Sequence, residues 1–138
     1  MYGKYRHSVD PKGRLFVPAK LKEELGEAFY VTLGLDHCLS VYTEAGWQQF
    51  VDRYNALPLS KARMIRGLFA NAAKCEPDKQ GRFLLPADLR QYAGIKQDVT
   101  FIGQGSHAEI WDSDAYAELE QDLLKPENLA AAMEELGF

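Results

Sequence analysis

The sequence is poor in the residues that carry most metal and redox chemistry. It has two cysteines and three histidines among 138 residues, without the spacing of a metal-binding motif. His37 and Cys38 are adjacent, but neighbours on an extended strand point to opposite faces, which disfavours a catalytic dyad. Gly103 and Gly105 lack the third glycine of a dinucleotide-binding motif. We therefore expect no metal, no cofactor and no catalysis.

Long apolar runs are also absent. No stretch is apolar enough to span a bilayer, and the first ten residues lack the apolar segment of a secretory signal. We therefore expect a cytoplasmic protein in which Cys38 and Cys75 are ordinary thiols. The enzymatic alternative, a small hydrolase that uses one of these thiols, lacks a base and an orienting acid beside either of them.

An overall excess of basic residues is missing as well. The formal net charge is −4, which by itself argues against a polyanionic partner. The charges are segregated, however. Residues 1–22 carry six basic residues against one acid (+5) and residues 59–82 carry six against two (+4), whereas residues 23–58 and 83–138 are acidic. Such segregation allows one basic face on an acidic protein.

The main feature that the sequence does have is an internal repeat. Residues 10–21, DPKGRLFVPAKL, return 68 positions later as residues 78–89, DKQGRFLLPADL. The similarity continues into the segments that follow each copy. A unit of about seventy residues is marginally stable alone because it buries a small part of its surface. We therefore expect two halves, residues 1–72 and 73–138, that share one core in a pseudo-symmetric body.

Strand and helix signals follow the same order in both halves, which is an α+β pattern. The first half predicts strands at 5–9 and 14–17 joined as a hairpin, a short helix between Pro18 and Gly26, and strands at 30–35 and 39–42. Thr43 and Ser60 are predicted to cap two further helices. The second half predicts strands at 82–85, 99–102 and 109–111, a helix from about Asp114 that buries Tyr116, Leu119 and Leu123, and a last helix from Pro126 to Gly137.

Each repeated segment begins with an Asp-x-x-Gly-Arg turn. Such a turn alone is most often only a bend, in which the Asp bonds the backbone and the Gly closes the chain. That interpretation leaves the Arg after each Gly unexplained. The Asp can accept from the Arg guanidinium and leave its other donors free for a phosphate or a guanine edge. The turns are therefore predicted to bind nucleic acid through Asp10, Lys12, Gly13, Arg14, Asp78, Lys79, Gln80, Gly81 and Arg82.

The chain resembles the MraZ family of bacterial transcription regulators. The resemblance lies in the opening residues Gly3, Tyr5, His7 and Asp10, in the two turns, and in Pro18 and Pro86. It implies a fold of tandem AbrB-like halves, each a swapped-hairpin β-barrel with appended helices. It also implies a ring-shaped homo-oligomer, associated with the nucleoid, that binds short direct repeats upstream of the division and cell-wall gene cluster. The residues alone allow RNA as well, and only the resemblance favours double-stranded DNA.

In the resemblance, the residues that face DNA are Asp10, Arg14, Asp78 and Arg82. The main alternative is a protein-interaction module of the same fold, such as an antitoxin-like subunit. Its acidic C-terminal part would then bind another protein. The acidic last helices are most simply solvated faces, and an apolar ridge of Leu129, Met133 and Leu136 favours contact between subunits as their functional alternative.

Overall fold

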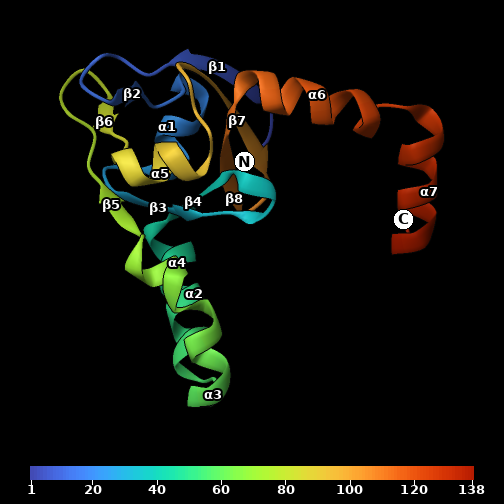
Figure 1. The fold of residues 1–138 in the computed structure, drawn as a ribbon, viewed down its shortest axis with the longest axis horizontal. Coiled ribbons are helices and arrows are strands. Elements are labelled where there is room, and N and C mark those ends of the chain that lie inside the picture. The colour runs from blue at the N-terminus through green and yellow to red at the C-terminus, as the bar shows by residue number, and fades with distance from the viewer.

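A computed structural model of residues 1–138 places six of the eight β-strands in one antiparallel sheet (Figure 1). Their order across the sheet is β1-β7-β8-β4-β3-β5. The six strands are β1 (Lys4–Ser8), β3 (Phe29–Leu33), β4 (Leu39–Thr43), β5 (Ala73–Cys75), β7 (Asp98–Gln104) and β8 (His107–Asp112). The other two, β2 (Arg14–Phe16) and β6 (Arg82–Leu84), form a separate two-stranded ribbon.

Strands of the two repeats pair with each other. β1 pairs with β7, β2 with β6 and β4 with β8. β5 has the place of β1 in the second repeat, and it pairs with β3 of the first. The predicted hairpin of residues 5–9 and 14–17 is therefore wrong, because β1 and β2 belong to different sheets.

The α+β class is confirmed, but no closed barrel is present. β2 and β6 pair only with each other, so the hydrogen-bond ladder of the main sheet does not continue into the ribbon. The main sheet stays open at β1 and β5. The predicted barrel for each half is replaced by an open sheet with a ribbon packed beside it.

Helices lie on both sides of the strands β3 and β4 in Figure 1. α1 (Ala19–Leu25) and α5 (Ala87–Tyr92) follow the ribbon strands, and α2 (Glu44–Asn55), α3 (Leu59–Ala62) and α4 (Arg66–Ala70) project from the opposite side. Single 3-10 turns lie at Leu35–His37 and Arg63–Ile65. Thr43 caps α2 as predicted, since its side chain accepts from the N–H of Gly46. Ser60 caps no helix, because Pro58 holds the N-cap position of α3.

One hydrophobic core unites the two repeats. Nineteen buried residues from both halves form a single cluster between the main sheet, the ribbon, α1 and α5. Phe29 of β3 packs edge to face on Phe83 of β6, with ring centroids 5.0 Å apart. This contact joins the first repeat to the second. The predicted sharing of one core is confirmed by this cluster.

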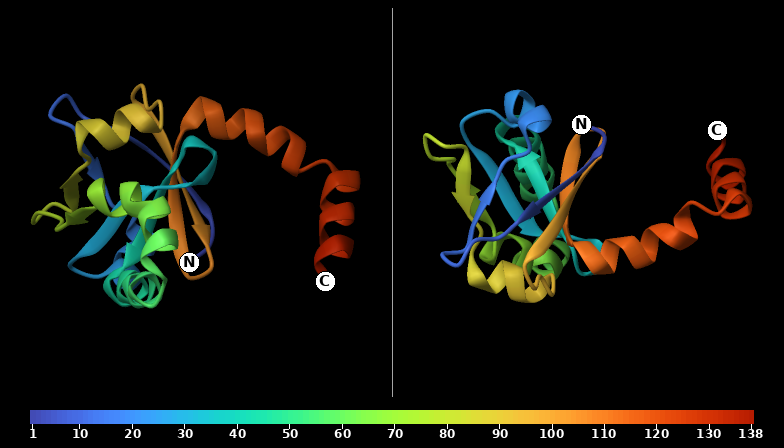
Figure 2. Two further views of the ribbon diagram at one scale, coloured as in Figure 1. Left: turned by 60° about the horizontal axis from the view of Figure 1, so that its bottom comes forward. Right: turned by 90° about the horizontal axis from the view of Figure 1, so that it is seen from above.

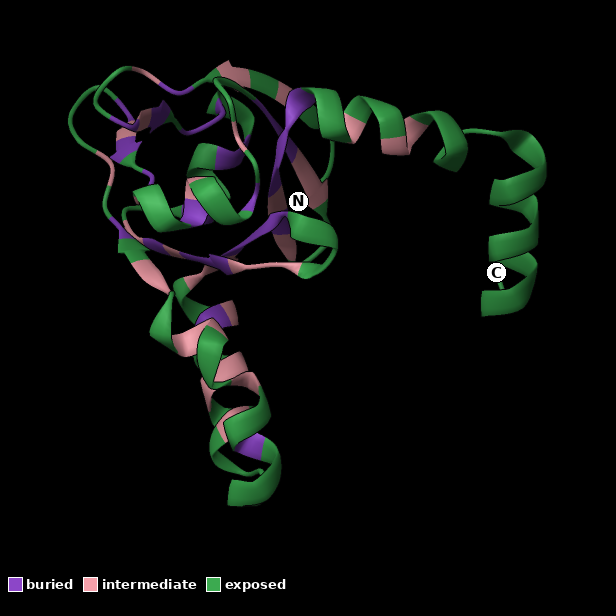
Figure 3. Ribbon diagram, in the orientation of Figure 1, coloured by how far each residue is buried: buried purple, intermediate pink, exposed green.

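The C-terminal helices α6 (Ser113–Leu123) and α7 (Pro126–Leu136) extend away from the body as an arm (Figures 1 and 2). Every residue from Gln121 to the end of the chain is exposed, as the green of Figure 3 shows along α7. The prediction that Leu123 is buried is therefore wrong. Tyr116 and Leu119 are half-buried at the root of α6. None of the helices combines the length and the apolarity needed to cross a membrane.

Candidate nucleic-acid interface

Turn 1, residues 10–14, is held by the carboxylate and the backbone of Asp10. The N–H of Gly13 donates to the Asp10 carbonyl, and the N–H of Asp10 donates to the Arg14 carbonyl, both at 2.9 Å. Oδ1 of Asp10 accepts from the N–H groups of Lys12 and Arg14 at 2.9 and 2.8 Å. Oδ2 accepts from Nε of Arg14 at 2.7 Å. The carboxylate thus fixes both the turn and the direction of the guanidinium.

Turn 2, residues 78–82, repeats this arrangement. Oδ1 of Asp78 accepts from the N–H groups of Gln80 and Arg82, each at 2.9 Å. Oδ2 accepts from Nε of Arg82 at 3.0 Å. Of the donors of each guanidinium group, the carboxylate accepts only from Nε. Both terminal nitrogens of each Arg are therefore left for a ligand. Gly13 and Gly81 take φ values of 81° and 83°, which a residue with a Cβ rarely adopts.

The same hydrogen bonds hold the pKa values of Asp10 and Asp78 below their ordinary value. The largest cause is the backbone N–H of Arg14 for Asp10 and that of Arg82 for Asp78, with the guanidinium and a second amide adding to it. Both carboxylates are therefore ionised at neutral pH. As carboxylates, they keep both guanidinium groups fixed at neutral pH.

The turns should lose stability in acid. A carboxyl whose pKa is lower in the folded than in the unfolded chain stabilises the fold above the unfolded value, about 3.9 for Asp, and this contribution is lost as pH falls through the folded value. The melting temperature of the natural chain should therefore exceed that of an Asp10→Asn/Asp78→Asn variant at pH 7. The difference should shrink below about pH 4.

Differential scanning calorimetry over a pH series measures this difference. Glu118→Gln serves as the control, since Glu118 is exposed and forms no hydrogen bond or ion pair, and it should change little. A difference between the natural chain and the double variant that stays constant from pH 7 to acid would contradict a role for the ionised carboxylates.

Residues alternate along the ribbon between the core and the solvent. Leu15 and Phe83 are paired across the ribbon and point inward, at 1% and 2% exposure. Their neighbours form the outer face of the ribbon, on which Arg14 is opposite Leu84 and Phe16 is opposite Arg82. Phe16 and Leu84 are 46% and 59% exposed. The outer face therefore carries two guanidinium groups on a diagonal, each with an exposed apolar side chain opposite.

The two turns lie at opposite ends of the ribbon. The N–H of Leu85 donates to the carbonyl of Gly13, and the N–H of Val17 donates to that of Gly81, both at 2.9 Å. Val17, whose N–H reaches Gly81, stands four positions after Gly13, so the glycines of the two turns are separated by about 14 Å along the ribbon at roughly 3.4 Å per residue. The tips carry the exposed side chains of Lys12, Lys79 and Gln80.

The structure thus brings all nine predicted residues to one ribbon and its two ends. Two further residues of the outer face, Phe16 and Leu84, were not predicted. The sequence does not show which of the apolar residues face outward, because the three residues after each Arg are all apolar and show no alternation. Only the register of β2 against β6 reveals which of them face outward.

The remaining chemical candidates do not converge. His37 packs against Tyr92, while Sγ of Cys38 donates to the carbonyl of Leu35 at 2.9 Å. Burial raises the pKa of the Cys75 thiol to about 12 and that of Cys38 still further. Nucleophilic cysteines need a lowered pKa, so neither thiol is activated. No group of three His, Cys, Asp or Glu side chains is arranged to hold a metal ion.

Known proteins resemble this chain over its whole length. The family model described as "MraZ protein, putative antitoxin-like" matches residues 1–65 and 68–136. A protein of Lachnoclostridium phytofermentans, named "Transcriptional regulator MraZ", is 45% identical over 99% of this chain and 96% of its own. Proteins of the same name from Caldicellulosiruptor bescii and Heliobacterium modesticaldum are 44% and 48% identical, over 100% and 83% of this chain and 99% and 82% of their own.

Proposed function

The chain belongs to the MraZ family, and on that basis we propose that it is a transcriptional regulator that binds specific sequences of double-stranded DNA. The observation that carries the proposal is the outer face of the β2–β6 ribbon. It presents Arg14 and Arg82 on a diagonal, each fixed by its own Asp. Such a protein acts in the cytoplasm on the nucleoid, without cofactor or catalysis.

The outer face has the shape and chemistry for the major groove of DNA. The groove admits a two-stranded ribbon, and an Arg with both terminal nitrogens free donates to O6 and N7 of guanine. Exposed apolar side chains such as Phe16 and Leu84 suit the thymine methyl group. Lys12, Lys79 and Gln80 at the tips bind phosphates and position the ribbon without reading sequence.

The segregated charges explain how an acidic protein binds DNA. Each phosphate neutralised by Lys or Arg releases condensed counterions, so the logarithm of the affinity falls with the logarithm of salt concentration by about 0.9 per contact. One ribbon makes few contacts. Several ribbons in a homo-oligomer would bind short direct repeats together, and the affinity would rise through effective concentration. We propose a ring-shaped homo-oligomer that binds the repeats upstream of the division and cell-wall gene cluster.

The arm supports the oligomer. Leu129, Met133 and Leu136 of α7 are 51%, 45% and 71% exposed, so their own chain leaves much of this apolar ridge uncovered. Apolar ridges of this kind on a helix are normally covered. A neighbouring copy of the chain is the partner that a homo-oligomer supplies, and a head-to-tail contact of this type closes into a ring.

Placing charges on the ridge should break the oligomer. The variant Leu129→Glu/Met133→Glu should leave the fold of one chain intact, because both side chains are solvent-exposed in it. The molar mass from light scattering after gel filtration should fall to that of a smaller species. Ala131→Glu adds a charge to another side of α7 and should leave the mass unchanged. An unchanged mass for the double variant would rule out the ridge as the subunit contact.

The pairing of strands between the repeats supports a related proposal on how the chain is divided into halves. Residues 1–72 and 73–138 are proposed as two AbrB-like halves of the swapped-hairpin type. In support, β1 pairs with the second half and β5 pairs with the first. The arrangement of β5-β3-β4 and β1-β7-β8 about the middle of the sheet is pseudo-symmetric.

The test is binding to the duplex upstream of the protein's own gene, measured by fluorescence anisotropy across a salt series. Scrambled DNA of equal length is the control. Tight binding that falls steeply with salt and needs the native sequence is expected. Equal binding to the scrambled duplex would reduce the protein to a nonspecific DNA-binding protein, and the absence of binding would overturn the proposal.

The exposed acidic arm and the family description also favour a second candidate, an antitoxin-like protein-interaction module. In that role the arm would bind a different protein, and the ribbon would be structural. The loss of Arg14 and Arg82 would then leave partner binding unchanged. The Arg14→Ala/Arg82→Ala variant therefore distinguishes the two candidates.

A further inference from the structure

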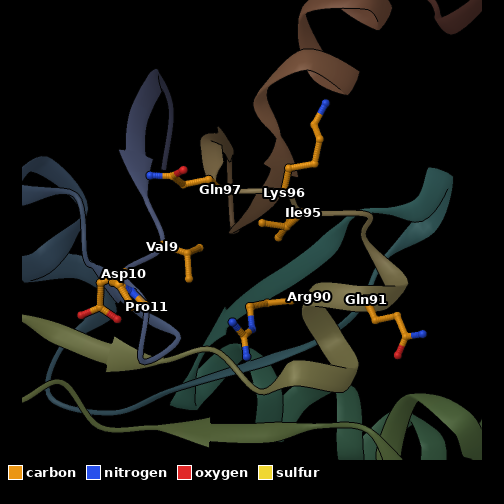
Figure 4. A pocket seen from close by; sticks show the side chains of 8 residues that line it. All are labelled: Val9, Asp10, Pro11, Arg90, Gln91, Ile95, Lys96 and Gln97. Atoms are coloured by element: carbon orange, nitrogen blue, oxygen red, sulfur yellow. The ribbon is translucent and has the colours of Figure 1, made fainter.

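A pocket of about 370 Å³ lies directly beside turn 1 (Figure 4). Asp10 and Pro11 form one side, Arg90 and Gln91 of α5 another, and the segment Ile95–Gln97 closes it. Figure 4 shows the Arg90 side chain reaching from α5 toward the turn. The pocket shares Asp10 with the proposed nucleic-acid interface, and its other lining residues, Arg90 among them, are not in that interface.

Arg90 lacks the partners that a half-buried guanidinium normally has. Its Nε is buried and has no hydrogen-bond partner, and its side chain forms no ion pair. The guanidinium packs against turn 1, since a Cβ added to Gly13 would lie 3.2 Å from its carbon and from one terminal nitrogen. Buried donors are satisfied in nearly all proteins, so a guanidinium without a protein partner is unusual, and Arg90 lines a pocket in which a ligand can meet its terminal nitrogens.

The other charges of the pocket are already paired. Asp10 is bound to Arg14. Nζ of Lys96 lies 2.8 Å from Asp114 and 3.7 Å from Asp112. Arg90 is therefore the one cation of this pocket whose charge is not compensated by a neighbouring carboxylate.

The second repeat has an equivalent pocket with the opposite charge. Lys22 of α1 stands 68 positions before Arg90, and a Cβ on Gly81 would lie 4.0 Å from its Nζ. Around it this pocket carries four carboxylates and a second lysine: Glu23, Glu27, Glu76, Asp78 and Lys79. The residues that line this pocket have a net charge of −2, from two cations and four carboxylates. Those that line the pocket beside turn 1 have a net charge of +1, from Arg90, Lys96 and Asp10. The two pockets occupy equivalent places in the repeat and differ in electrostatics.

We propose that the pocket beside turn 1 binds a phosphate group through Arg90. The planar guanidinium offers paired N–H donors that match two phosphate oxygens, which a lysine at the same place does not. The group has two possible sources: the DNA backbone next to the bound ribbon, or a small phosphorylated molecule. Because Arg90 packs under Gly13, either occupant lies against the turn that holds Arg14. The equivalent pocket beside turn 2 repels anions and binds none.

The test is isothermal titration of the full chain with inorganic phosphate, at an ionic strength held constant with sodium chloride. Arg90→Gln should raise the dissociation constant for phosphate by about tenfold or more, because it removes a charged hydrogen-bond donor. Arg90→Lys keeps the charge but loses the paired donors, and should weaken binding as well. The matched control in the other repeat, Lys22→Gln, should change the dissociation constant less than about twofold.

Each outcome decides the proposal. No phosphate binding by the natural chain overturns it, and so does an equal loss in the Arg90 and Lys22 variants. If Arg90→Gln does not fold, the other two variants decide. Phosphate binding that is unaltered in both Arg90→Lys and Lys22→Gln would show that the paired N–H donors of Arg90 have no role. The titration contains no DNA, so its result is independent of the proposed regulator function.

A second measurement identifies the source of the phosphate. Operator affinity is followed across a salt series for the natural chain and Arg90→Gln. If the dependence of the logarithm of affinity on the logarithm of salt concentration is shallower by about 0.9 in the variant, the pocket is assigned to one DNA phosphate. An unchanged slope, together with loss of free phosphate binding, assigns it to a small phosphorylated molecule. Both results support the pocket as a phosphate site.

Discussion

Replacing Arg14 and Arg82 together by alanine should lower the affinity for operator DNA about 100-fold or more. A bidentate contact between Arg and guanine contributes about 1–3 kcal/mol of discrimination, and two such contacts are removed. Each 1.4 kcal/mol is a factor of ten in the dissociation constant. Repetition of the ribbon in an oligomer enlarges the loss, since every ribbon is affected. Fluorescence anisotropy with the operator duplex measures the effect.

The fold should survive this change. Oδ1 of each Asp accepts from backbone N–H groups, and these bonds do not need the Arg side chain. Both ion pairs are partly exposed, and pairs of that kind contribute about 0–1 kcal/mol. The oligomer mass and the melting temperature should therefore stay close to those of the natural chain.

A control with the same loss of charge separates the ribbon from the net charge. Arg53→Ala/Arg63→Ala removes two exposed guanidinium groups from the projecting helices of residues 44–70, far from the ribbon in Figure 1. It should weaken binding only slightly. A ribbon variant that retains the affinity and salt slope of the natural chain would exclude the two Arg residues from DNA binding and favour the antitoxin-like alternative.

The repeat in the sequence predicts the turns because turn chemistry is local. Asp, Gly and Arg at fixed offsets determine the hydrogen bonds around Asp10 and Asp78 without help from the rest of the fold. The helix limits set by Thr43 and Pro126 are predictable for the same reason. The two turns of the candidate site and these helix limits could therefore be derived from the residues alone.

Strand pairing could not be predicted in the same way. In a duplicated chain the two copies of a strand have the same apolar pattern, so pairing within a half and pairing between halves are equally compatible with the sequence. The sequence favours a hairpin of residues 5–9 and 14–17, whereas β2 pairs with β6. The outward position of Phe16 and Leu84 and the place of Arg90 beside turn 1 follow from that pairing. They become visible only in the structure.

Replacing Phe83 by alanine should destabilise the whole chain by about 3–5 kcal/mol. The ring is 2% exposed and packs on Phe29 from the other repeat, so its removal leaves a cavity in the core. This loss is a large part of the stability of a typical domain, about 5–15 kcal/mol. The melting temperature should fall by roughly 10–20 °C for a chain of this size. Urea unfolding followed by circular dichroism measures the change in free energy.

The adjacent residue provides the control. Leu84 lies in the same strand but on the outer face, at 59% exposure, so Leu84→Ala should change the free energy of unfolding by less than about 0.5 kcal/mol. Because Phe29 and Phe83 belong to different halves, Phe83→Ala should shift one cooperative transition in which both halves unfold together. Two separate transitions, with only the second half destabilised, would show that each repeat folds on its own and that the ribbon is not supported by a core common to both.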